Sequence, residues 1–184
     1  MEIVAFNTDD KADGSGKAKI TWISKDLLNT TRRMNSANNY GAIGTGGNGG
    51  WENCEMRTYL KNTIKPLIPE TVRNAIVNVT KIQSTVTDGS KVIDGQTTTD
   101  DVWVPSVHEI ISTNTKYETT GTTYSGKFDS GANRIKNKNG VASTWWLRSA
   151  HNVNNFNAIF LTNGILGNYS AENTYGIALG FCTD

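Results

Sequence analysis

The chain has 184 residues and a formal net charge of +1, with 18 basic and 17 acidic side chains. This balance excludes a bulk electrostatic field that would recruit nucleic acid or an anionic membrane surface. No apolar run approaches the ~20 residues of a membrane span, and the first residues lack the pattern of a signal peptide. The length predicts one domain over residues 1–184. Because Met1 leads directly into a predicted strand, we expect the chain to be a C-terminal fragment of a longer protein.

In the first half of the chain, two short strands precede a helical region. Apolar patterning and turn residues predict strands at 1–6 and 19–24 and helices at 25–35, 51–64 and 69–76. The helix at 51–64 is the clearest, because its apolar side chains recur at helical spacing until Pro66 ends it. Pro69 lies in the first turn of the next helix, where proline is tolerated.

The second half contains mainly strands. The predicted strands cover residues 77–86, 143–150, 156–162 and 175–182, with a hairpin turn at 163–166. A short strand within 97–105 leads into a small helix, which Ser106 and Glu109 begin at capping-box spacing. Residues 112–140 are polar and glycine-rich, so we expect a long excursion with little regular structure. Together, these predicted elements indicate an α+β domain with short antiparallel strands, two or more helices and long loops.

The sequence lacks the motifs that mark an enzyme or a metal site. It has two histidines, no His-Glu-x-x-His and no Gly-x-Ser-x-Gly. The carboxylates of residues 9–13 resemble part of a calcium loop, but the distal bidentate glutamate is missing, which favours a turn. Cys54 and Cys182 are interpreted as small buried hydrophobic residues. We therefore expect no catalytic residues, no metal and no cofactor.

The composition changes after Ala150. Asparagine makes up 7 of the last 34 residues against 14 of the first 150. Lys, Glu, Gln, Met and Trp together make up 28 of the first 150 residues but only one, Glu172, of the last 34. When the adenines of an Asn codon are replaced freely, these five amino acids can never result. The tail is thus depleted in this set and enriched in Asn, although asparagine-rich hairpins are a simpler alternative.

The frame "WWLRSA…NG…GFC" around this tail resembles variable proteins of diversity-generating retroelements. Four upstream motifs add to the resemblance and extend it over nearly the whole chain: "ITWISKDLL", "GGWENCEMRTYL", "IPETVRNAI" and "VWVPSVHEI". In that family, found in phages and gut bacteria, an error-prone reverse transcriptase mutates adenine positions of a C-terminal repeat. The resemblance implies a C-type-lectin-like fold, related to formylglycine-generating enzymes, and a non-catalytic binding module on a phage tail or bacterial cell surface. Its partner would be a protein or glycan receptor on a host or neighbouring cell, without nucleic acid or membrane insertion. An oligomer could arise through the parent protein.

The resemblance places the variable surface at about residues 151–176. The positions expected to vary and to bind ligand are His151, Asn152, Asn154, Asn155, Asn157, Ile159, Leu161, Ile165, Leu166, Asn168, Tyr169, Asn173 and Tyr175. The fixed scaffold would consist of Trp145, Trp146, Leu147, Arg148, Gly180 and Phe181. Strand alternation predicts that Phe156, Ala158 and Phe160 face the core while Asn157, Ile159 and Leu161 face outward.

Asparagine and serine would supply adaptable hydrogen bonds at such a surface, and the tyrosines would supply rigid anchors, as in antibody paratopes. Two other functions stay open. A carbohydrate-binding lectin-like module is the first, although the chain lacks the Glu-Pro-Asn, Gln-Pro-Asp and Trp-Asn-Asp motifs of calcium-dependent lectins. An oxidase of the formylglycine-generating type is less favoured, because that chemistry needs two neighbouring cysteines, and Cys54 and Cys182 are predicted in different elements.

Overall fold

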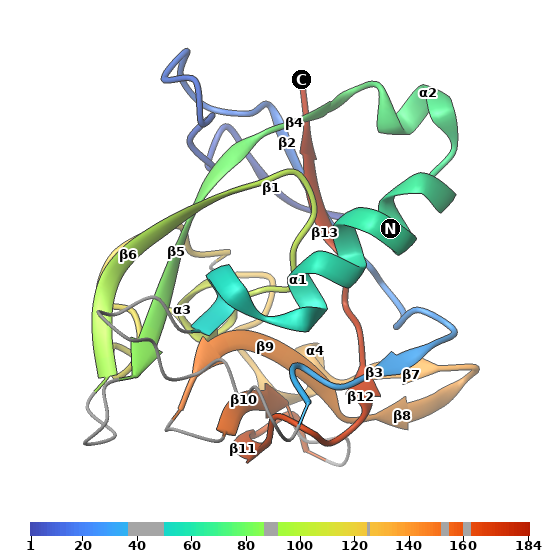
Figure 1. Cartoon of the computed structure of the whole chain (residues 1–184), viewed down its shortest axis with the longest axis vertical. Helices are drawn as coiled ribbons and strands as arrows, with labels where there is room; N and C mark the ends of the chain where they lie inside the picture. The colour runs from blue at the N-terminus through green and yellow to red at the C-terminus, as the bar shows by residue number, and fades with distance from the viewer. Residues whose placement is uncertain (37–49, 87–91, 125, 152–154, 160–162) are drawn as a thin grey trace.

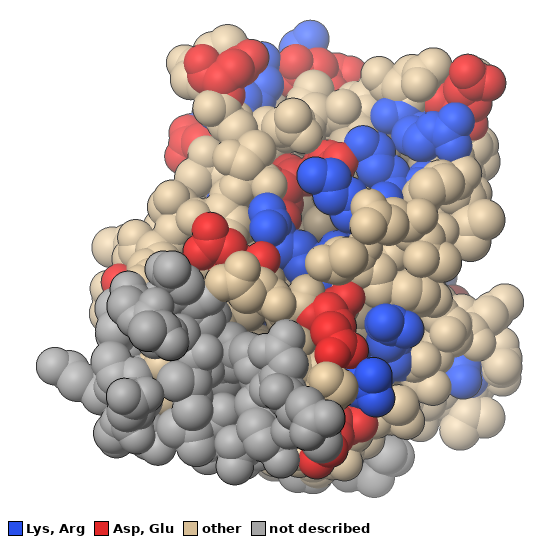
Figure 2. Space-filling view, viewed as in Figure 1, with Lys and Arg blue, Asp and Glu red and all other residues tan. Residues whose placement is uncertain are grey.

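The computed structural model describes the whole chain except residues 37–49, 87–91, 125, 152–154 and 160–162. The described residues form four small sheets and a few short helices, which confirms the predicted α+β class. None of the helices in these ranges is long and apolar enough to cross a membrane. On the face shown in Figure 2, basic and acidic side chains are interspersed, consistent with the near-zero net charge.

The two ends of the chain belong to one antiparallel sheet. Its strands, in spatial order, are β1 (Glu2–Phe6), β2 (Ile20–Ile23), β13 (Gly180–Thr183) and β4 (Ile76–Val77). The last strand therefore lies between the second strand and a strand from the middle of the chain (Figure 1). This pairing joins the C-terminal strand to strands from the start and the middle of the chain.

The second sheet contains most of the C-terminal tail. Its order is β11 (Leu166–Ser170), β10 (Asn155–Ile159), β9 (Trp145–Ala150), β12 (Tyr175–Gly176) and β3 (Thr31–Arg32). The predicted single strand at 175–182 is thus wrong in one respect, because its two ends belong to different sheets. The connecting residues 177–179 are buried, so the apolar run is explained by passage through the core between the sheets.

The predicted helical region near residue 51 is confirmed, although its turns vary. It consists of η2 (Gly50–Asn53), α1 (Glu55–Tyr59), η3 (Leu60–Ile64) and η4 (Lys65–Leu67), followed by α2 (Glu70–Arg73). The helix predicted at 25–35 is wrong. The backbone amides of Leu28 and Met34 instead donate to the carbonyl oxygens of Ile177 and Ala171, so pairing with the C-terminal run replaces helical bonds.

Two further hairpins and two one-turn helices complete the domain. The longer hairpin pairs β5 (Val79–Val86) with β6 (Val92–Asp100), and the shorter pairs β7 (Lys136–Lys138) with β8 (Val141–Ser143). The helices are α3 (Val107–Ile110) and α4 (Gly131–Arg134). The capping box predicted at α3 is confirmed: the Glu109 amide donates to Ser106 Oγ at 3.2 Å, and the Ser106 amide donates to Glu109 Oε2 at 2.9 Å.

Removal of this cap should destabilise the domain modestly. We expect Ser106→Ala to lower the free energy of unfolding by about 1 kcal/mol, because a buried amide loses its acceptor. Urea denaturation measures the change. Ser130→Ala is the matched control, since Ser130 caps the exposed α4 in the same way and its unpaired amide can bind water. An equal or larger loss in the control would contradict the expectation.

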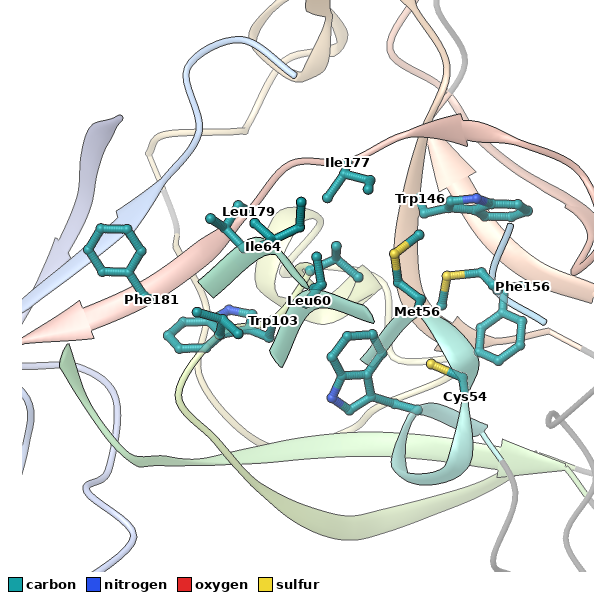
Figure 3. Packing of buried hydrophobic residues seen from close by; sticks show 14 of the residues in the cluster. Cys54, Met56, Leu60, Ile64, Trp103, Trp146, Phe156, Ile177, Leu179 and Phe181 are labelled. Carbon is teal, nitrogen blue, oxygen red and sulfur yellow. The ribbon is translucent and has the colours of Figure 1, made fainter. Parts of the chain in front are cut away.

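Strand β9 separates two hydrophobic clusters, and all six of its residues are buried. Trp146, Ala150 and Phe156 belong to the first cluster, where Figure 3 shows Cys54 and Met56 of the helical region close to Trp146 and Phe156. Trp145, Leu147 and Ile159 belong to the second. Both faces of this part of the sheet are therefore covered.

Candidate binding surface

The hairpin of β10 and β11 forms the described centre of the predicted variable surface. Its register pairs Phe156 with Tyr169 and Ile159 with Leu166. Gly164 lies before β11 with φ of +65°, a conformation that favours glycine. The predicted hairpin is confirmed by this pairing, and its turn packs against the first residue of α4.

Among the predicted variable side chains that the structure describes, three are exposed. Ile165 is 55% exposed, and Asn168 and Asn173 are also exposed. Leu166 is partly buried against the second hydrophobic cluster. The exposed set combines an apolar side chain with two amides that can donate and accept hydrogen bonds.

The two tyrosines of this surface form an aromatic stack on the scaffold. The rings of Tyr169 and Tyr175 meet edge to face, with centroids 4.7 Å apart, and Tyr175 lies 5.0 Å from the buried Trp146 ring. Asn173 donates from Nδ2 to Tyr175 Oη at 3.3 Å. Since both tyrosines are partly buried, each presents an edge whose orientation is fixed by ring packing.

The outward orientation predicted for Ile159 is wrong. Ile159 is fully buried, whereas Phe156 is buried as predicted on the other face of β10. Phe156 and Ile159 lie on opposite faces, as the alternation predicts, but both faces are covered. The second cluster includes Tyr117, Tyr124 and Phe128, which come from the excursion that was expected to lack regular structure.

Other predicted positions are only partly described. Asn152, Asn154 and Leu161 lie outside the described residues, and for Asn155 and Asn157 only the backbone pairing with β11 is described. His151 is half-buried, with its ring centroid 5.8 Å from that of Tyr117. Burial, with the charge of Lys116, lowers the pKa of His151 below its usual value.

The expected scaffold residues lie in the interior beneath this surface. Trp145, Trp146, Arg148, Gly180 and Phe181 are all buried. The indole nitrogens of Trp145 and Trp146 donate to backbone carbonyls of Arg134 and Arg32, at 3.0 and 2.8 Å. A side chain at Gly180 would collide with the Trp103 indole. The two indole bonds fix β9, which lies between β10 and β12 in its sheet.

Arg148 is the centre of a buried charged network that the sequence did not predict. Its guanidinium forms a bidentate ion pair with Glu109, with Nη1–Oε2 and Nη2–Oε1 distances of 2.6 and 2.9 Å. It also donates to the carbonyl oxygens of Ile82 and Val104. Burial alone would raise the pKa of Glu109, but the charges of Arg148 and Lys81 outweigh it and hold the pKa at about 2.

Glu118 lies beside this network without a direct cationic partner among the described residues. Its Oε1 accepts hydrogen bonds from Ser149 and Ser84, at 2.6 and 3.2 Å, while no described group bonds to its buried Oε2. Burial raises the pKa of Glu118 to about 7, although the bond from Ser149 and the charge of Arg148 oppose the rise. Ser149 precedes the last residue of β9, so Glu118 contacts the strand that leads into the variable surface.

Glu118 should make stability depend on pH. The unfolded carboxyl titrates near 4.5 and the folded one near 7. The stability contributed by the protonated folded form is therefore fully present below pH 4.5 and is lost as pH rises to about 7. This interval corresponds to roughly 3 kcal/mol. Urea denaturation at about pH 5 and about pH 8 should show the loss, and Glu118→Gln should reduce it. An unchanged pH dependence in the variant would exclude Glu118 as its source.

A hollow of about 480 Å³ adjoins the network. Its lining includes Lys81, Glu109, Arg148 and Glu118, together with threonines from the segment 120–123. Across the described residues, no three His, Cys, Asp or Glu side chains are grouped to hold a metal ion.

The fold and surface define an α+β domain in which a buried, charged interior supports a hairpin of polar and aromatic residues. By sequence comparison, residues 20–182 match a family described as a domain of unknown function, DUF6273, and the chain belongs to this family. No curated protein and no solved structure matches the chain.

Proposed function

We propose that the chain is a non-catalytic binding module whose ligand-contacting surface lies within residues 151–176. The observation that carries the proposal is the restricted composition of the tail, enriched in Asn and depleted in Lys, Glu, Gln, Met and Trp. Adenine-directed mutagenesis of Asn codons by a diversity-generating retroelement accounts for both features. In this proposal the domain has a C-type-lectin-like fold and is displayed on a phage tail or bacterial surface.

The arrangement of the described tail residues supports this proposal. Ile165, Asn168 and Asn173 are accessible to a partner, while the adjoining scaffold of β9 is buried throughout. Substitution at the exposed positions would therefore leave the core intact. The short antiparallel strands are compatible with the proposed lectin-like fold.

The genetic origin is tested by sequencing the DNA beside the coding region. The proposal requires a near-identical copy of the segment for residues 151–176 that differs at adenines, next to a reverse transcriptase gene. A locus without such a copy, sequenced completely in several isolates, would contradict diversification by a retroelement. Differences scattered over all four bases would do the same.

Binding is tested with labelled protein on intact bacterial cells and on a glycan array, with and without a calcium chelator. Ile165→Lys should abolish binding to any cell that the unchanged protein labels. Val141→Lys is the matched control, because Val141 is an apolar residue with 67% exposure on the separate β7–β8 hairpin. Equal loss in both variants would argue against a specific surface. Chelator-sensitive glycan binding would favour a calcium-dependent lectin instead.

A further inference from the structure

Three ionisable side chains from separate parts of the chain meet in the interior. Asp9 comes from the connection between β1 and β2, Lys81 from β5 and Glu109 from α3, and their side chains are at most 2% exposed. Lys81 Nζ lies 2.5 Å from Asp9 Oδ1 and 3.0 Å from Glu109 Oε1. The ammonium also lies 3.9 Å from the centre of the Trp103 ring. The group is therefore buried and closely packed, with the Trp103 ring against the ammonium.

We propose that Lys81 and Asp9 condense to form an intramolecular amide cross-link. Burial favours this product because a buried ion pair bears a large desolvation cost, which a neutral amide does not. Exclusion of water also slows the reverse reaction, hydrolysis. This inference does not depend on the proposed binding function.

The surrounding groups fit the steps of the condensation. Proton transfer from Lys81 Nζ to Asp9 across their short contact gives the neutral amine and carboxylic acid. The nitrogen lone pair then attacks Asp9 Cγ, while the hydroxyls of Thr21 and Tyr124 donate to the carboxyl oxygens. The second proton on nitrogen then moves to the departing hydroxyl within the tetrahedral intermediate. One C–N bond forms, one C–O bond breaks and one water leaves, without any oxidant or reductant.

The charges of the site determine when the reaction can occur. Burial on its own lowers the pKa of Lys81, but the charges of Asp9 and Glu109 outweigh it, so the net shift is upward. The amine is thus protonated when the site first assembles. Because its reactive form depends on proton transfer within the folded interior, we expect condensation to follow folding. The adjoining hollow, which Lys81 and Glu109 line, offers the released water a way out.

Mass spectrometry of the purified full chain tests the proposal. We expect the intact mass to be lower than the sequence mass by one water molecule. Trypsin should fail to cut after Lys81, and fragmentation should identify a branched peptide that joins Lys81 to Asp9. The pair Lys65–Asp101 is an internal control, because its atoms also lie 2.5 Å apart but it is 29% and 13% exposed. An intact mass equal to the sequence mass, or a cross-link at another pair, would overturn the proposal.

Two variants identify the reacting groups. Lys81→Arg keeps a positive charge but should retain the full sequence mass. Asp9→Asn should lose ammonia in place of water, through its side-chain amide. A folded Lys81→Arg protein that still loses one water would exclude Lys81 as the amine, and the mass of the unchanged protein decides the cross-link even if a variant does not fold.

Discussion

Replacement of Arg148 with methionine is expected to lower the free energy of unfolding by about 3–5 kcal/mol, because it leaves a buried carboxylate without its principal partner. The Arg148 and Glu109 side chains are 1% and 2% exposed, so water cannot replace the lost bonds. The carbonyl oxygens of Ile82 and Val104 also lose their donors. Methionine keeps much of the side-chain volume, which limits any contribution from a cavity. Urea denaturation measures the loss.

The matched control is Arg33→Met. Arg33 forms an ion pair with Glu55 at 3.1 Å, but the two side chains are 47% and 27% exposed. Water and salt screen such a pair, so the expected loss is within about 1 kcal/mol. If the two variants lost similar stability, burial would not determine the value of the Arg148 pair. A more stable Arg148→Met protein would show that the desolvation cost of the network exceeds its attraction.

The members of the buried network could not be predicted from the sequence as a group. Its members Asp9, Lys81, Glu109 and Arg148 are far apart in the chain, and no sequence motif joins them. Only the fold brings them together, through the pairing of distant strands. One signal was present: Arg148 stands within the apolar strand 145–150, where a charged residue must find a partner in the interior. The sequence could indicate that a partner exists but could not identify Glu109.

Local features were predicted well where short-range physics decides them. The capping box at Ser106 and the helical region that starts near residue 51 could be predicted from the spacing of neighbouring residues. The helix predicted at 25–35 is wrong because long-range contacts decide the structure there. Its backbone amides are taken by the C-terminal run some 140 residues away, and tertiary pairing overrides local preference.

The candidate surface was predicted in part for a related reason. Ile165, Asn168 and Asn173 are exposed as expected, because they lie before, within and after the edge strand β11. Ile159 is buried because Tyr117, Tyr124 and Phe128 cover the face on which it lies. These three aromatic residues stood within a segment interpreted as a polar loop. The available signal was the presence of three large aromatic side chains in an otherwise polar segment, because such side chains often anchor a segment to the core.

Gly164→Ala should destabilise the hairpin that carries the candidate surface. The new Cβ would overlap the Gly131 carbonyl carbon and oxygen, far inside van der Waals contact distance, and both are backbone atoms that cannot turn aside. The positive φ of Gly164 adds a conformational cost of roughly 1–2 kcal/mol for any other residue. The steric conflict should add about 1–3 kcal/mol, as for other overpacked sites. We expect a total loss of about 2–5 kcal/mol in urea denaturation.

Gly14→Ala separates these two costs. Gly14 has φ of +75°, close to the value at Gly164, but a Cβ there would have nothing within 4 Å. It should therefore show the conformational cost alone, and the difference between the variants measures the crowding between Gly164 and α4. Equal losses would mean that the turn is free to move away from α4. A clear excess at Gly164 would show that this contact fixes the position of Ile165 and the start of β11, which a binding surface built on a hairpin requires.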